Sequence, residues 1–187
     1  MSDTKKRGRP RAFCEAAALD AAEDLFAARG FDTVTISELT RAMGIAPPSF
    51  YAAFGSKAAL YERVLDRRIA ADPFVDEVLS GADTLRGGIA ALLRAAASRY
   101  ADGTGCLVAE GARACSDETA SRAARARLAA TRGRIEAFVA ARDGDPAIPG
   151  AVVTALFGLS AAARAGAATE ELDAFADTVA RGLFPER

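Results

Sequence analysis

The sequence contains no histidine and no tryptophan. Histidine is the side chain that most often acts as a general base or binds a metal, so its absence argues against most hydrolytic and metal-dependent chemistry. No Gly-x-Ser-x-Gly motif occurs either, and the glycines at 103, 105 and 111 follow no strand and precede no Gly-Lys-Ser. We therefore expect a protein that is not an enzyme and that uses no metal or other cofactor.

Cysteine is also scarce. Cys14, Cys106 and Cys115 are odd in number and have no Cys-x-x-Cys spacing, which argues against a disulfide framework and a structural zinc site. Cys106 and Cys115 are close enough in sequence to allow a redox pair, but small buried cysteine is the commoner arrangement. Measured thiol reactivity would separate these two interpretations.

Long apolar runs are absent as well. No continuous run of about 18 apolar residues occurs anywhere in the chain. The N-terminal segment is basic, but no apolar segment of the kind found in signal peptides follows it. We expect a cytoplasmic protein.

The residues that are abundant favour helix. Of the 187 residues, 51% are hydrophobic and 26% charged, and long alanine-rich stretches carry regular arginine and glutamate. No segment has a convincing strand pattern. The predicted fold class is all-α, with a basic arm at 1–12, a helix-turn-helix domain at 13–56, a connecting helix at 57–72 and a larger helical domain at 73–187.

The most informative stretch runs from Thr35 to Lys57. Thr35 and Glu38 have the spacing of a helix capping box, and Gly44 is a typical helix terminator. Because a residue before proline disfavours the helical conformation, we expect the next helix to begin at Pro48 rather than Pro47. Two short helices joined by a tight turn form a helix-turn-helix, which can also be a simple helical hairpin.

A DNA-reading function requires the second of these helices to present one face outward. Phe50 and Phe54, at i and i+4, are the expected anchors of that helix. The residues expected to face outward are Ser49, Tyr51, Ala52 and Ala53. No Arg, Asn or Gln is among them, so this face carries little base-reading chemistry, and specificity is expected to rest partly on DNA shape.

A basic arm precedes the first helix. Residues 1–69 carry a net charge of +2 and the remainder −3, and the positive charge is concentrated in Lys5, Lys6, Arg7, Arg9 and Arg11. A basic terminus can be a solvated tail. Next to a helix-turn-helix, however, its arginines can enter a narrow minor groove and neutralise phosphates.

The flanking helices complete a small domain. Apolar residues at helical spacing predict a first helix over 15–29, ended by Gly30. Ser56 is the expected cap of a fourth helix, which Asp72 and Pro73 end.

Together these residues resemble the TetR family of bacterial regulators. The resemblance lies in Arg-Gly-Arg-Pro-Arg at 7–11, Arg-Gly-Phe at 29–31, Thr-Ile-Ser-Glu-Leu at 35–39, Met-Gly-Ile at 43–45 and Ser-Phe-Tyr-Ala-Ala-Phe-Gly-Ser-Lys at 49–57. A Gly-Cys-Leu sequence at 105–107, before a short helix, is similar to one subgroup. The resemblance implies a homodimer with one DNA-binding domain per subunit and a larger helical domain for an effector and for dimerisation.

Carried over position by position, the resemblance assigns DNA contacts in three groups. Pro47, Pro48, Ser49, Tyr51 and Ala52 correspond to contacts of the reading helix, and Lys57 to a phosphate-binding lysine. Thr35 and Ser37 correspond to backbone contacts of the preceding helix. Arg7, Arg9 and Arg11 complete the expected DNA-binding residues.

The larger domain has five expected helices, of which a short one begins at 105–110. One is capped by Asp83 and reaches Tyr100, and the longest runs over 117–142, with its arginines on a solvated face. Residues 143–150 are expected to be a break. The last two helices are expected at 151–166 and 169–184.

Effector-binding candidates are polar groups near apolar ones between Phe74 and Val139. They are Leu93, Tyr100, Val108, Glu110, Arg113 and Phe138. For Glu110 and Arg113, at i and i+3, the spacing favours an ordinary surface ion pair over a ligand contact.

The last two helices correspond to the dimer interface of the family. The residues expected there are Val152, Leu156, Leu159, Ala163, Leu172, Phe175 and Val179. An intramolecular core would need the same apolar pattern.

The function expected from the sequence is a ligand-responsive repressor that binds an inverted-repeat operator as a homodimer until a small-molecule effector releases it. The alternative is a helical small-molecule-binding or protein-interaction module without operator binding.

Overall fold

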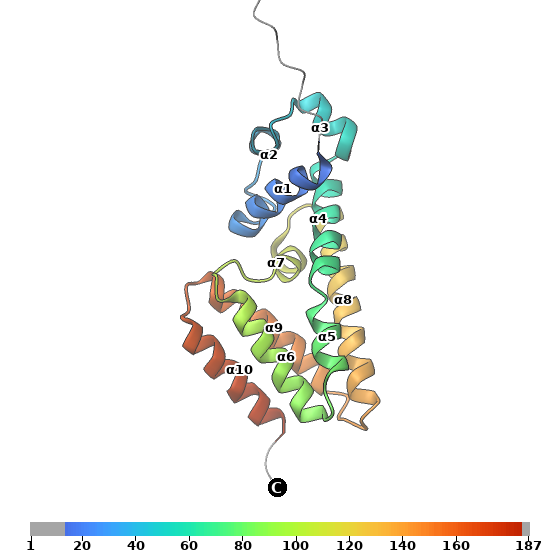
Figure 1. The fold of residues 1–187 in the computed structure, drawn as a ribbon, viewed down its shortest axis with the longest axis vertical. Helices are drawn as coiled ribbons and strands as arrows, with labels where there is room; N and C mark the ends of the chain where they lie inside the picture. The colour runs from blue at the N-terminus through green and yellow to red at the C-terminus, as the bar shows by residue number, and fades with distance from the viewer. Residues whose placement is uncertain (1–13, 185–187) are drawn as a thin grey trace, which may run out of the picture.

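The computed structural model describes residues 14–184 (Figure 1). This part of the chain consists of ten α-helices and contains no β-strand, which confirms the all-α class. The predicted contacts of Arg7, Arg9 and Arg11 lie outside the described residues. The helices are α1 Glu15–Arg29, α2 Ile36–Met43, α3 Pro47–Phe54, α4 Lys57–Ala71, α5 Phe74–Ser80, α6 Leu85–Tyr100, α7 Leu107–Ala114, α8 Glu118–Ala140, α9 Ile148–Arg164 and α10 Thr169–Leu183.

The helix-turn-helix forms α2 and α3 at one end of the molecule (Figure 1). Thr35 and Glu38 make the predicted capping box at the start of α2. Gly44 ends α2 in the left-handed conformation, with φ 67° and ψ 32°, which glycine adopts without steric cost. The chain is thereby turned toward α3 within three residues.

The predicted start of α3 is wrong by one residue. α3 begins at Pro47, with Ala46 as its N-cap, and Pro48 takes the second position. The residue before a proline only tends to avoid the helical conformation. At a helix start this tendency is opposed by two advantages of proline. Proline fixes φ near the helical value, and the missing N–H groups would have no intrahelical partner there.

The first hydrophobic core lies under the helix-turn-helix. Phe26, Phe50, Leu60, Tyr61 and Leu65 are among its fully buried members. Residues of α7 and the first half of α8 belong to the same cluster, namely Leu107, Ala112, Ala120 and Ala124. The apolar core therefore continues past residue 73, and α7 packs with the N-terminal helices.

The second core joins α6, α9 and α10 with α5 and the second half of α8. Leu92, Leu93, Ile135, Leu159 and Leu172 are completely or almost completely buried in it. In Figure 1 these helices occupy the opposite end of the molecule from α2 and α3.

Three expectations for this region are corrected. The sequence-based prediction had no helix between Pro73 and Asp83, where α5 forms. The cap of α6 is Thr84, not Asp83, because the Thr84 hydroxyl accepts the Gly87 N–H at 3.1 Å. α9 begins at Ile148, inside the expected break, with Pro149 in its first turn.

Cys14, Cys106 and Cys115 are all free thiols. Over residues 14–184, no helix combines the length and the apolar character needed to span a lipid bilayer.

Candidate functional site

The outward face of α3 is built as the sequence predicts. Phe50 and Phe54 are buried and fix the helix on the core, while Pro47, Pro48, Ser49, Tyr51 and Ala52 are exposed. Ala53 is half-buried and packs against the core, so it belongs to the anchoring side. Tyr51 is 51% exposed, and its ring packs edge-on against Phe50 with centroids 5.5 Å apart. Packing on Phe50 thus supports the exposed Tyr51 ring, which carries the hydroxyl group.

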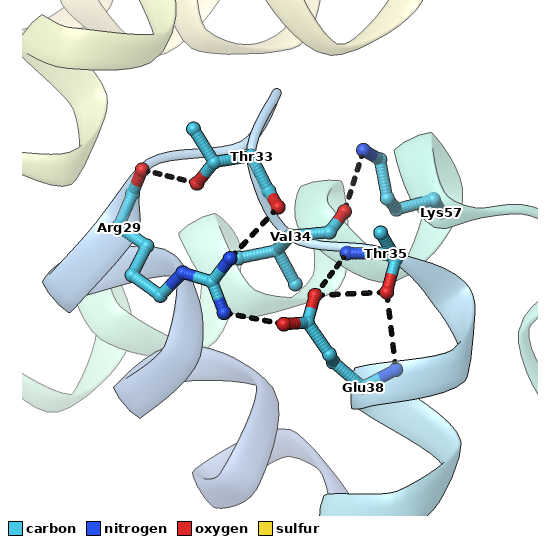
Figure 2. Close-up of polar contacts among 6 residues, drawn as sticks. All are labelled: Arg29, Thr33, Val34, Thr35, Glu38 and Lys57. Carbon is cyan, nitrogen blue, oxygen red and sulfur yellow. Dashed lines mark hydrogen bonds and ion pairs between the residues drawn. The ribbon is translucent and has the colours of Figure 1, made fainter.

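A polar network fixes the start of α2 behind this face (Figure 2). The Thr35 N–H and hydroxyl both donate to Glu38 Oε2, at 2.9 and 2.8 Å, and the Glu38 N–H donates to Thr35 Oγ1 at 3.2 Å. Arg29, at the end of α1, donates to Glu38 Oε1 at 2.5 Å and to the Thr33 carbonyl at 3.1 Å. The network ties the end of α1 to the start of α2.

The Glu38 carboxylate is the centre of this network. Hydrogen bonds from Arg29 and from the backbone and side chain of Thr35 lower its pKa from the ordinary 4.5 to about 2. Each of these donors favours the charged carboxylate. Glu38 is therefore ionised at every pH at which the protein would meet DNA.

Lys57 joins the same region from the start of α4. Its Nζ donates to the carbonyls of Val34 at 2.9 Å and Phe31 at 3.0 Å, and it lies 4.1 Å from the centre of the Phe31 ring. Two of its three protons are therefore used inside the protein. The Thr35 hydroxyl is likewise engaged in the cap, whereas Ser37 is exposed on α2. The phosphate contacts expected of Lys57, Thr35 and Ser37 remain predictions.

A cavity of about 260 Å³ lies further along α4. Its walls come from α4 to α9 and are mostly apolar, with Ile69, Phe74, Leu128 and Phe157 among the residues that line it. Four of the residues that line the cavity form two ion pairs. Arg99 Nε donates to Asp72 at 2.7 Å, and Arg134 Nε lies 3.0 Å from Asp76.

Two polar side chains of the α6–α7 region face this cavity. Tyr100 and Cys106 both line it, and burial, together with the adjacent thiol, raises the pKa of Tyr100 well above its ordinary value. Tyr100 is thus a neutral hydroxyl group at neutral pH. The cavity offers hydrogen-bonding groups on an otherwise apolar wall, the usual composition of a small-molecule site.

Only Tyr100 and Val108 of the six predicted effector-binding residues line the cavity. Leu93 and Phe138 are buried in the second core and are not among the residues that line the cavity. Glu110 and Arg113 pair with each other at 2.9 Å, the surface ion pair that their spacing also allowed. The sequence reasoning missed the contribution of α5, whose Phe74, Val75, Val78 and Leu79 have helical spacing and could have indicated it.

The predicted dimer residues divide into two groups. Val152, Leu159, Ala163 and Leu172 are buried within the subunit itself, and Leu156 is buried beside the cavity. Helices of the same subunit cover these side chains, so they present almost no surface to a second subunit. Phe175 is 42% exposed and Val179 is half-buried, so these two remain available to a partner. Phe175 lies against Gly158 of α9.

The geometry defines a class of protein: an exposed helix-turn-helix reading face on one end of a helical chain that holds a small-molecule cavity is the arrangement of a ligand-responsive DNA-binding regulator. The family model for bacterial regulatory proteins of the tetR family matches residues 18–64. The chain is 38% identical to the HTH-type transcriptional repressor BdcR of Escherichia coli (strain K12), over 92% of each protein. The chain therefore belongs to the TetR family.

A second relative and a solved structure agree with membership of the TetR family. The HTH-type transcriptional repressor ComR of Escherichia coli (strain K12) is 43% identical over 65 residues, 35% of this chain and 31% of that protein. A cysteine-substituted form of the TetR family transcriptional regulator CifR, complexed with 26-bp double-strand operator DNA, superimposes with a TM-score of 0.82. It is 34% identical, and the alignment covers 95% of this chain and all of that one.

Proposed function

We propose that this protein is a cytoplasmic transcriptional repressor that binds an inverted-repeat operator as a homodimer and is released by a small-molecule effector. The observation that carries the proposal is the exposed face of α3, Pro47 to Ala52, held outward by the buried rings of Phe50 and Phe54. The likeness to a regulator complexed with operator DNA supports it. Twofold symmetry of the dimer corresponds to twofold symmetry of the operator.

The proposed contacts divide by chemistry. Tyr51 and Ser49 supply hydroxyl groups for phosphate or base edges, and Pro47, Pro48 and Ala52 supply apolar contact to sugars or thymine methyl groups. Arg7, Arg9 and Arg11 are proposed to add contacts to the minor groove. Because this face has few base-specific donors, the proposed recognition rests on DNA shape as well as on bases.

The proposed effector site is the cavity beside α4. Its volume of about 260 Å³ and its mostly apolar wall suit a compact molecule with few polar groups. α4 carries Lys57, next to α2, at its start and Ile69, on the cavity wall, near its end. Release requires the effector to bind more tightly to a conformation that does not fit the operator, since equal affinity shifts nothing.

The proposed dimer interface is the exposed side of α9 and α10. On α9 this side carries the small residues Ala151, Thr154, Gly158, Ala161 and Ala165, and on α10 it carries Phe175. Small residues allow close approach of two helices, and Phe175 supplies the large apolar side chain that such an interface needs at its centre.

DNA binding is tested with duplexes from the region flanking the protein's own gene. The wild type should bind one fragment with an inverted repeat more tightly than an unrelated duplex, with affinity that falls as salt rises. Tyr51→Ala should lose this binding while its circular dichroism spectrum stays unchanged, and Tyr51→Phe separates the hydroxyl from the ring. A wild type without preference for any flanking fragment would contradict the proposal and favour a protein-interaction module.

A further inference from the structure

The start of α3 offers DNA no backbone donor. Pro47 and Pro48 have no N–H, and the N–H groups of Ser49 and Phe50 both donate to the Ala46 carbonyl, at 2.9 and 3.1 Å. The start of a helix ordinarily presents free N–H groups that bind phosphate. At this position a phosphate contact has to come from a side chain.

Most side-chain cations near α3 are already engaged. Residues 14–71 contain six Lys and Arg against eight Asp and Glu, so this unit is negative without the arm. Lys57 and Arg29 hold the start of α2, as described above. Three arginines of α4 instead pair with acids of α1: Arg63 with Glu15, Arg67 with Asp20 and Arg68 with Glu23.

Arg41 is the exception. Its side chain is exposed in the last turn of α2 and makes no hydrogen bond or ion pair with residues 14–184. The side chain of every other Lys and Arg in this range makes at least one. Glu38, three residues earlier on the same helix, is occupied by Arg29 and Thr35. Arg41 thus has a guanidinium group without a partner among the residues that the structure describes.

The position of Arg41 directs it to the same DNA as α3. Ser37 lies one turn before it, so the two exposed side chains share a face of α2. After Arg41 the helix ends within two residues, and the turn at 44–46 leads directly to Pro47. Arg41 is therefore six residues before Pro47, at the end of α2 from which the chain turns into the part of α3 that lacks backbone donors.

We propose that Arg41 binds a DNA phosphate at the edge of the groove that α3 enters, and that it supplies the contact that Pro47 and Pro48 remove. The guanidinium group matches phosphate geometry and can donate two parallel hydrogen bonds. The contact is to the backbone, so it carries no sequence preference. The inference rests on the proposed function in one respect, that α3 faces DNA.

The test compares Arg41→Ala with the wild type on an unrelated duplex and on the operator fragment, over a range of salt concentrations. Losing one phosphate contact should lower the slope of log affinity against log salt by about 0.9 per subunit and weaken binding by roughly fivefold to tenfold per subunit at about 0.1 M salt. Both duplexes should lose affinity equally. Arg41→Lys should restore most of the slope, because lysine still provides a point charge.

Arg122→Ala is the control, since Arg122 is an exposed arginine of α8, a helix outside the helix-turn-helix. The inference is overturned if Arg41→Ala and Arg122→Ala have the same salt slope. It is also overturned if the loss occurs only on the operator fragment, which would assign Arg41 to a base edge. Failure of the proposed function looks different: the wild type would bind both duplexes equally, while Arg41→Ala would still lower the slope.

Discussion

Glu38 is the side chain on which the start of α2 depends. Its carboxylate accepts from Arg29, from the Thr35 N–H and from the Thr35 hydroxyl, and these donors lower its pKa to about 2. A carboxylate whose pKa is lowered on folding stabilises the folded state above its unfolded pKa. That stabilisation disappears as the pH falls through the folded pKa, here between about 4.5 and about 2.

Glu38→Gln should therefore change the pH dependence of stability. At neutral pH the variant should melt at a lower temperature than the wild type, because the amide cannot form the ion pair with Arg29. Between pH 4.5 and about 2, the melting temperature of the variant should fall less than that of the wild type. Thermal melts followed by circular dichroism across this range measure both effects. An equal fall in melting temperature with pH for the two proteins would contradict the role given to Glu38.

Single residues also show which contacts the sequence could predict. The capping box of Thr35 and Glu38 was predictable because its partners are three residues apart. The contacts of Lys57 were not, because the carbonyl groups that it binds are 23 and 26 residues away. A carbonyl group has no residue-specific signature, so no sequence pattern announces it as an acceptor.

Among the helices, α7 is held closely to the N-terminal unit. Buried Tyr61 of α4 donates its hydroxyl to the Leu107 carbonyl at 2.9 Å, and burial raises its pKa. Gly111 of α7 faces that tyrosine with no room for a methyl group. A Cβ there would collide with the Tyr61 hydroxyl and would lie 2.9 Å from the Ala124 side chain. Glycine at 111 sets the distance between α4, α7 and α8.

Gly111→Ala should destabilise the protein by about 1–3 kcal/mol, because the added methyl group forces α7 away from α4. Gly133→Ala is the matched control in α8, where a Cβ meets no atom within 4 Å. That substitution should stabilise the protein by about 0.5–1 kcal/mol through helix propensity. Urea unfolding measures both free energies, and destabilisation of equal size in the two variants would contradict the packing argument.

Arg164 links three elements at the end of α9. Its Nη1 donates to the Ala27 carbonyl of α1 at 2.9 Å and to the Thr104 carbonyl of the α6–α7 loop at 2.7 Å. The same loop is fixed to α9 by buried Ser160, whose hydroxyl accepts the Cys106 N–H at 2.8 Å. Gly105, with φ 66°, fits between Ser160 and Arg164, where a Cβ would collide with both.

Arg164→Gln should loosen this junction. We expect faster amide hydrogen exchange in residues 27–34 and 103–107. We also expect a loss of about 1–3 kcal/mol in unfolding free energy, since two partly buried carbonyl groups lose a charged donor. Arg94→Gln, which breaks an exposed pair with Asp177, should cost about 0–1 kcal/mol and leave exchange in both segments unchanged. Equal exchange in the two variants would contradict a role for Arg164 at the junction.

Helix α5 is the helix that the sequence pattern did not predict. The other helices were predicted within a few residues, because long alanine-rich segments with one apolar stripe are unambiguous. α5 has seven residues and follows Asp72 and Pro73, which were interpreted only as a break. The cavity was incompletely predicted for a related reason: its wall combines α4 to α9, and their packing is not encoded in any local spacing.

The reading face and the proposed dimer face belong to different parts of the molecule. In Figure 1, α3 lies at one end of the molecule and α9 and α10 lie toward the other. The cavity is lined by residues of α4 to α9 and by none of α3 or α10. The sequence predicted the dimer helices but not their orientation, because an apolar stripe does not say which neighbour covers it. Phe175 and Gly158 lie on the exposed side of α10 and α9, which is the side proposed to face a partner.

Phe175→Glu should convert the dimer to a monomer with an unchanged circular dichroism spectrum, because a charge at the centre of the interface would be buried unpaired. Operator affinity should fall with it, since each subunit would bind one half-site alone. Ala137→Glu, at an exposed position of α8, is the control and should remain dimeric. Sedimentation velocity measures the change, and a dimeric Phe175→Glu would place the interface elsewhere.

The central claim is that two α3 helices of one dimer read a symmetric site, and hydroxyl-radical footprinting of the DNA flanking the gene tests it most directly. The account predicts two protected half-sites related by twofold symmetry, their centres about one helical turn (about 34–36 Å) or a multiple of it apart. Both should disappear together in Tyr51→Ala. A single asymmetric protected segment, or no protection at any flanking site, would contradict the claim.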